Sequence, residues 1–278
     1  MDPTREDAFD RIVAHIDRSR RSWNSPTFVV GPFTLYPDYA RPALGAAAFT
    51  ESDVRELLRC ANEEPQWASI ATNVLLVEWN ELEWIVESVS ELAPAVSQAG
   101  LTVSTNPLLI KRSDTDAGSG PAPIDAETEI VDPDSDPREL IAAWRFLDPV
   151  GSAPPRTAGQ ILRRIRRTAA SISDDEVARE MRNRAASGGY GEAVVRFQGR
   201  IVGAGMHEPF LDVSEITHLA VLPSFRRRGF GTALAAALAA QAFDNGVDLV
   251  FVESAPQAAT MYERAGFQLI GAIGRAAL

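Results

Sequence analysis

The chain is poor in several residues on which common protein sites depend. Its 278 residues include one cysteine, Cys60, which excludes an internal disulfide framework. The three histidines, His15, His207 and His218, have no metal-ligand spacing with one another or with that cysteine, so we expect no metal. Lys111 is the only lysine, and a G-x-x-x-x-G-K-[ST] phosphate loop is therefore absent. Disulfide scaffolds, zinc sites and P-loop enzymes are excluded.

Long apolar runs and positive net charge are also lacking. No stretch approaches transmembrane length, and the acidic N-terminus is not a signal peptide, so we expect a cytoplasmic protein. The formal net charge of −11 argues against nucleic acids and anionic membranes as partners and favours cationic ones. A predicted helix over 157–170 has a basic face, which we interpret as solvated because carboxylates follow it. That face consists of Arg163, Arg164, Arg166 and Arg167.

The stretch from Leu219 to Thr232 combines an apolar strand end, a basic turn and the start of a helix expected to run from Thr232 to Asn245. Gly229 and Gly231 would let the backbone approach an anion closely, and three arginines precede them. The first turn of a helix has unpaired N–H groups and partial positive charge. The junction therefore predicts a pyrophosphate site.

The same stretch carries a family resemblance. Arg226-x-x-Gly229-x-Gly231 is similar to the [Q/R]-x-x-G-x-[G/A] coenzyme A loop of the GNAT acyltransferases. A strand pattern ending in Pro223 precedes it, and an apolar strand over Val247–Glu253 follows. A last helix, for which Ser254 and Gln257 form a candidate capping box, contains the family-like pattern A-x-x-M-Y-x-x-x-G-F ending at Phe267. On this combination the chain is identified as a member of the GNAT superfamily.

The resemblance implies an α/β fold with a mixed sheet in the C-terminal half, and acetyl-CoA as co-substrate without a metal. It implies that Glu215 is the general base and that Tyr262 protonates or hydrogen-bonds the leaving thiolate. The implied coenzyme contacts are Leu219, Ala220, Val221, Arg226, Arg227, Arg228, Gly229, Phe230, Gly231, Thr232 and Ala258. The acceptor would be a primary amine of a small molecule or peptide, and a homodimer is compatible with the sequence.

Several alternatives stay open at this level. Glu215 could be an ordinary carboxylate at a strand start, and Tyr262 a core aromatic. The family often has an asparagine where this chain has Ala255, which could weaken coenzyme binding. A non-catalytic acyl-CoA-binding regulator is therefore the rival function. Simple alternation along the strand places His218 on the face opposite Glu215, as a core histidine, whereas His207 and Glu208 could touch an acceptor.

The N-terminal half contains a weak repeat of the C-terminal one. Trp84–Ser88 aligns with Val250–Ser254, 166 residues further along the chain. At the same offset, Ala99-Gly-Leu aligns with Ala265-Gly-Phe. The half is similar to the helper domain of two-domain bacterial GNAT proteins. It lacks the site residues of the C-terminal copy, because Val96 occupies the position of Tyr262 and residues 60–65 occupy that of the basic loop. We therefore predict a helper domain over 1–112, a linker over 113–125 and an acetyltransferase domain over 126–278.

Other local patterns predict further elements. Helices are expected over 6–20, 50–64, 90–99, 136–144, 157–170 and 173–186, with capping pairs Thr50/Asp53 and Ser173/Glu176. Strands are expected over 27–36, 73–78, 83–87, 101–110, 126–131 and 213–222, and a hairpin over 192–207 turns at Gln198-Gly199.

Overall fold

The computed structural model describes residues 3–22, 28–35, 39–43, 46, 48–63, 81–86, 92–114, 126–130, 138, 140–143, 158–179 and 191–277. They divide into two compact units. Unit 1 contains residues 1–108, 253–256 and 270–278, and unit 2 contains residues 109–252 and 257–269. The predicted strand over 73–78 and most of the predicted linker lie outside the described residues.

Unit 1 is a small sheet with helices. Its elements are α1 (Pro3–Ser22), β1 (Phe28–Val30), β2 (Phe33–Leu35), β3 (Tyr39–Pro42), α2 (Glu51–Glu63), β4 (Glu81–Ile85), α4 (Leu92–Gln98), most of β5 (Val103–Arg112) and the end of β11 (Gln268–Ala277). The strand order is β1-β2-β3-β4-β11-β5. As predicted, Thr50 and Asp53 cap α2: the Thr50 N–H donates to the Asp53 carboxylate at 2.8 Å.

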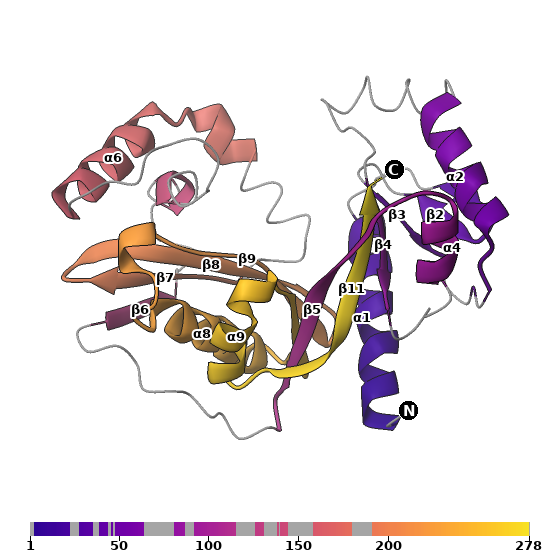
Figure 1. The fold of residues 1–278 in the computed structure, drawn as a ribbon. Helices are drawn as coiled ribbons and strands as arrows, with labels where there is room; N and C mark the ends of the chain where they lie inside the picture. Colours follow the sequence, from indigo (N-terminus) through magenta and orange to yellow (C-terminus); the bar gives the residue numbers. More distant parts are fainter. Residues whose placement is uncertain are drawn as a thin grey trace. The chain divides into compact units, whose positions relative to one another are not determined.

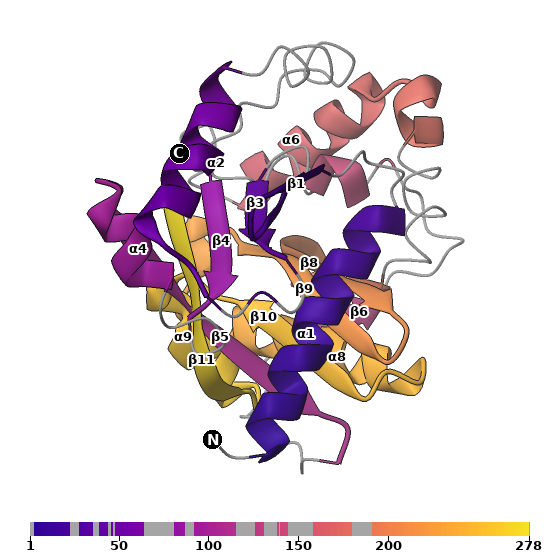
Figure 2. The same cartoon turned by 90° about the vertical axis from the view of Figure 1, so that its right-hand side faces the viewer.

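Unit 2 is a larger mixed sheet with helices on both faces. Its elements are β6 (Ala126–Ile130), α6 (Ala158–Ser171), β7 (Gly191–Phe197), β8 (Arg200–Phe210), β9 (Val213–Val221), η1 (Pro223–Phe225), α8 (Phe230–Asp244), β10 (Leu249–Glu253), η2 (Pro256–Ala258) and α9 (Ala259–Arg264). The strand order is β5-β10-β9-β8-β7-β6. Figure 1 and Figure 2 both show α6 on one side of β8 and β9 and α8 on the other.

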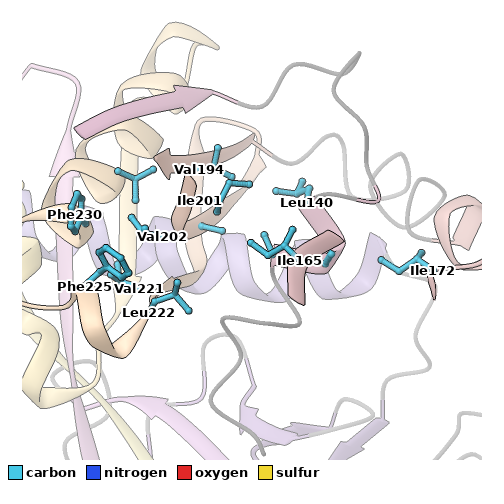
Figure 3. Close-up of a cluster of buried hydrophobic side chains, with 14 residues drawn as sticks. Leu140, Ile165, Ile172, Val194, Ile201, Val202, Val221, Leu222, Phe225 and Phe230 are labelled. Atoms are coloured by element: carbon cyan, nitrogen blue, oxygen red, sulfur yellow. The ribbon is translucent and has the colours of Figure 1, made fainter. Parts of the chain in front are cut away.

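Two apolar clusters fill unit 2. One contains Ile165 of α6 and Val202 of β8, together with Phe225 of η1 and Phe230, the first residue of α8. Figure 3 shows the rings of Phe225 and Phe230 beside Val221 and Leu222, with Ile165 further along the same cluster. The other contains the buried face of α8 with Ile216 and Tyr262. The basic turn at 226–229 therefore lies between two buried aromatic side chains, Phe225 and Phe230, which anchor it at both ends.

Glycines fix the turns that join these elements. Gln198 (φ 52°) and Gly199 (φ 71°) form the two-residue hairpin turn between β7 and β8, as predicted. Gly246 (φ 86°) ends α8, where the Val247 N–H donates to the Ala242 carbonyl at 3.1 Å. This 6→1 bond is the C-terminal cap typical of a left-handed glycine.

The internal repeat is confirmed in three dimensions. In each copy a strand, a short helix and a left-handed glycine are followed by a long strand: β4, α4 and β5 in the first, and β10, α9 and β11 in the second. Gly100 has φ 90° and Gly266 has φ 89°. The 6→1 cap bonds also correspond, from Leu101 to Val96 at 3.2 Å and from Phe267 to Tyr262 at 3.0 Å.

Each compact unit contains a strand segment from the other repeat. The end of β11 belongs to unit 1, where it pairs antiparallel with β4 from Ile273↔Ile85 to Ala277↔Glu81. The end of β5 belongs to unit 2, beside β10. The compact units therefore differ from the two repeats in sequence, and the boundary at 113–125 stays a prediction.

Three local expectations were wrong. Residues 60–63 form the last turn of α2, so the 166-residue offset does not extend to the basic loop. Ser254 does not cap the last helix: its hydroxyl donates to the Ala255 carbonyl at 2.9 Å, and α9 begins later, after Ala258. Helix α8 begins at Phe230 and not at Thr232, because Gly229 in the left-handed region turns the chain into the helix two residues earlier.

Candidate active site

The site begins where strands β9 and β10 part. They pair in parallel at only three positions, from Leu249↔Val213 to Phe251↔Glu215. Beyond Glu215, β9 continues to Val221 and stays paired with β8. Among the described residues, the β10-facing edge of Ile216–Val221 therefore has no strand partner. Its backbone groups, apart from the Val221 carbonyl that Arg226 occupies, can bind an extended ligand. Glu215 occupies the last paired position.

At the far end of β9 lies the basic turn. Arg227 (φ 60°) and Gly229 (φ 87°) are both left-handed, and Gly229 is the N-cap of α8 without a side-chain hydrogen bond. The first helical bond runs from the Ala233 N–H to the Gly229 carbonyl at 3.0 Å. The N–H groups of Phe230, Gly231 and Thr232 therefore precede the first intrahelical donor. Such N–H groups at a helix N-terminus are suited to bind an anion, and the pyrophosphate site stays a prediction.

The three arginines of the turn are exposed, and two are held in place. Arg226 donates its Nε–H to the Val221 carbonyl at 2.9 Å, which leaves its terminal nitrogens for an anion. The Arg228 guanidinium lies 5.4 Å from the centre of the Phe225 ring. The charges at the helix N-terminus are thereby partly preorganised.

Packing explains why other residues of the loop are small or aromatic. The Phe230 ring is buried against Phe197 and Phe225, so only its backbone can contact a ligand. A Cβ on Gly231 would lie 2.4 Å from the Met261 sulfur, so this glycine lets α8 approach α9. Thr232 Oγ1 donates to the Met261 carbonyl at 3.4 Å. The start of α8 is therefore tied to the helix that carries Tyr262.

Tyr262 is buried in the cluster beneath α8. Its ring makes an edge-to-face contact with Phe267, with centroids 5.6 Å apart. Burial raises the pKa of Tyr262 above its ordinary value, so the phenol stays protonated at neutral pH. The side chain is thus suited to donate a hydrogen bond and not to act as a base.

Lys111 holds the other end of that helix. This buried lysine, at the end of β5, donates to the Ala265 carbonyl at 2.8 Å. Burial lowers the pKa of Lys111. A cation at the C-terminus of α9 complements the helix dipole, so Lys111 fixes the segment between Tyr262 and Phe267.

A β-bulge changes which side chains share the face of β9 that carries Glu215. His207 pairs with Ile216 and Met206 pairs with His218, so Thr217 is an extra residue on β9. Because paired residues share a face, His218 lies on the same face as Glu215. It is also exposed. The expectation of a core histidine on the opposite face was wrong, since simple alternation fails across a bulge.

His207 lies on the other face of the sheet and has no exposed surface. It is fully buried, with Nδ1 2.7 Å from Ser214 Oγ. Burial lowers the pKa of His207 to about 4, an effect that Gln241 opposes. Because it is fully buried, His207 cannot touch an acceptor, whereas Glu208 pairs with Glu215 and lies on the same face of the sheet.

Gly191→Ala is expected to lower the free energy of unfolding by about 2–3 kcal/mol, as an overpacked core residue does. A Cβ there would lie 1.8 Å from His207 Nε2 and 2.7 Å from Gln241 Oε1, and the Ser214 contact prevents the imidazole from moving away. Urea unfolding followed by circular dichroism measures the change. Gly199→Ala is the matched control, because its Cβ would meet nothing within 4 Å and costs only about 1 kcal/mol of backbone strain. Equal losses would contradict the clash.

Comparison with known proteins matches this geometry to a family. The family model described as "Acetyltransferase (GNAT) family" matches residues 159–267, which include the parted strands, the basic turn and Tyr262. Residues 159–267 belong to the GNAT acetyltransferase family. Comparison with curated proteins gave no significant match.

Solved GNAT structures resemble the chain well beyond the matched residues. A GCN5-related N-acetyltransferase from Kribbella flavida is 19% identical with a TM-score of 0.66, covering 97% of this chain and 95% of its own. A GCN5-related N-acetyltransferase from Sphaerobacter thermophilus is 17% identical with a TM-score of 0.53, covering 87% and 73%. A tandem GNAT protein from the clavulanic acid biosynthesis pathway is 12% identical with a TM-score of 0.52, covering 88% and 78%. At these identities the likeness shows the fold, including its tandem arrangement.

Two further observations concern the described part of the chain. None of its helices is long and apolar enough to cross a membrane. Within the same residues, no group of three His, Cys, Asp or Glu side chains could hold a metal ion.

Proposed function

We propose that the protein is an N-acetyltransferase that uses acetyl-CoA and acetylates a primary amine by direct attack in a ternary complex. The parting of β9 and β10 immediately after Glu215 carries the proposal. It leaves a strand edge for the pantetheine arm, with the preorganised helix N-terminus of α8 at one end and Glu215 at the other. The implied roles of Leu219, Ala220, Val221 and Ala258 in coenzyme binding are part of this proposal.

The proposed reaction needs mainly positioning and proton removal. An acyl thioester is already activated, so holding it beside the amine supplies much of the acceleration. A base on β9 removes a proton from the ammonium, and a backbone N–H of the open β9 edge stabilises the developing oxyanion. Tyr262 donates a hydrogen bond to the departing thiolate. The coenzyme phosphates would bind to the N–H groups and arginines of the turn from Arg226 to Thr232.

Arg226→Ala combined with Arg228→Ala is expected to weaken acetyl-CoA binding at least about 100-fold, since each charge-assisted contact contributes about 1.5–3 kcal/mol. Calorimetric titration with acetyl-CoA measures the loss. Arg163→Ala with Arg167→Ala is the matched control: it removes the same charge from the exposed face of α6 and should leave binding within about twofold.

Two results would contradict the proposed function. One is no binding by the wild-type protein at millimolar acetyl-CoA, and the other is equal weakening by both double variants. After binding is established, spermidine, cadaverine, glucosamine and a short peptide with a free N-terminus provide an acceptor screen. Binding without acetylation of any amine would favour the non-catalytic acyl-CoA-binding regulator, for which Ala255 is the one supporting residue.

A further inference from the structure

We infer that His218 is the group that takes the proton from the acceptor ammonium, whereas Glu215 binds the ammonium by charge. The inference rests on the proposed function and refines its acceptor side. It assigns a catalytic role to a residue that sequence alternation places on the wrong face of the sheet.

Geometry carries the first step. The extra residue Thr217 makes the separation of Glu215 and His218 equivalent to two positions along a regular strand, or about 7 Å. Both side chains then stand on the same face, close to the point where β10 leaves β9. Bulges often change the direction of side chains beside active sites. Among the described residues, this bulge also leaves one buried polar group without a hydrogen bond. The Thr217 hydroxyl is buried without a hydrogen-bond partner in the described structure.

The charges around His218 are acidic. Glu208 of β8 pairs with Glu215 of β9. Met206 of β8 pairs with His218 on one side and with Glu192 of β7 on the other, so Glu192 lies two strands away from His218. Two strand spacings put the Glu192 and His218 backbones about 10 Å apart. On β10, the residue facing Glu215 is the apolar Phe251. The arginines of α6 at 163, 164, 166 and 167 are exposed. This face therefore attracts a cationic amine.

Chemistry separates the two roles. Three carboxylates stabilise an ammonium and so oppose its deprotonation. An imidazole, which ordinarily titrates near 6.5, is a more effective base at neutral pH than a carboxylate, which titrates near 4.3. In the step, one ammonium N–H bond breaks and its proton passes to the imidazole. The amine nitrogen then bonds to the thioester carbon, the C–S bond breaks, and the second nitrogen proton passes to the thiolate.

The first test follows turnover against pH for any amine in the screen that is acetylated. Wild-type kcat/KM should rise through an inflection above about pH 6, the range of imidazole bases and not of carboxylates. His218→Gln should lower kcat/KM about 100-fold at pH 7.5 and remove the inflection. Glu215→Gln should raise the KM for the amine about 10-fold and keep the inflection. A wild-type pH profile in His218→Gln, or an inflection lost only in Glu215→Gln, would overturn the assignment.

The second test needs no acceptor. Diethyl pyrocarbonate modifies accessible neutral imidazoles, and His15 and His207 are buried whereas His218 is exposed. Peptide mass analysis should find fast modification at His218, and saturating acetyl-CoA should slow it at least about fivefold. An unchanged rate with bound acetyl-CoA would place His218 outside the site and refute its role. Failure of the proposed function is distinguishable, because calorimetry would then show no acetyl-CoA binding.

Discussion

Arg275→Met is expected to lower the free energy of unfolding by about 3 kcal/mol, the cost of removing one partner from a buried ion pair. Arg275 makes two bonds of 2.6 Å to Glu253 and also pairs with Glu83. Glu83 is bonded to Arg41 at 2.6 Å, and Asn106 donates to Glu253 at 2.7 Å. Without Arg275, two largely buried carboxylates would share one guanidinium and one amide. Urea unfolding at pH 7 measures the loss.

Arg196→Met is the matched control. It breaks a 2.6 Å pair with Glu129, whose carboxylate is 48% exposed, and should cost no more than about 1 kcal/mol. Equal losses in the two variants would show that the Arg275 network contributes no more than a surface pair.

The same network predicts a pH dependence. Burial opposes the charged form of Glu253, but hydrogen bonds from Arg275 and Asn106 outweigh it and lower its pKa below the ordinary 4.5. A pKa lowered by folding contributes stability above the unfolded value, and this stability is lost as the pH falls through the folded value. Below pH 4.5 the wild type should therefore lose stability more steeply than Arg275→Met. Parallel acid curves would rule out this linkage.

Tyr262→Phe is expected to lower kcat about 100- to 1000-fold, the effect of removing one hydrogen bond to a charge that develops in the transition state. Because the raised pKa of Tyr262 exceeds the value near 8.5 of an ordinary thiol, the phenol should keep its proton and act as a hydrogen-bond donor. The ratio of wild-type to variant kcat should therefore stay constant between about pH 7 and 9. Steady-state kinetics with an acetylated amine measures it.

Structural controls accompany this substitution. Phenylalanine keeps the edge-to-face contact with Phe267, so acetyl-CoA affinity and the midpoint of urea unfolding should both stay close to wild type. A kcat within threefold of wild type would leave Tyr262 as a core aromatic. A large loss of affinity or stability would indicate that the hydroxyl supports the fold and not the leaving group.

Local sequence signals predicted the left-handed glycine and the basic turn before α8 correctly, whereas phosphate binding by this turn stays a prediction. Gly229 adopts the left-handed conformation that glycine favours, the arginines precede the helix, and Tyr262 lies on the apolar stripe of α9. These features depend on residues close together in the chain, where conformational preference and helical spacing can be read directly. The repeat was also detectable, since its strand, helix and glycine lie at fixed distances.

The acceptor half was predicted less well because it depends on strand register. Nothing in the run from Ser214 to Ala220 signals that Thr217 is an extra residue, so alternation assigned His218 to the wrong face. The burial of His207 follows from its pairing with Gly191, a residue from another strand. The pairing of β11 with β4 is equally non-local. Such features follow from contacts between distant segments, and one sequence without those contacts does not specify them.

The exchanged strand ends couple the folding of the two units and limit which segments of the chain can be deleted. Unit 1 combines residues 1–108 with the end of β11, which follows unit 2 in the sequence, so its sheet cannot be completed before β11 has been synthesised. Deleting the first repeat would remove the end of β5 and the Lys111 bond to α9 from unit 2. Each compact unit thus depends on a strand end from the other repeat, so neither repeat is expected to fold completely when it is expressed alone.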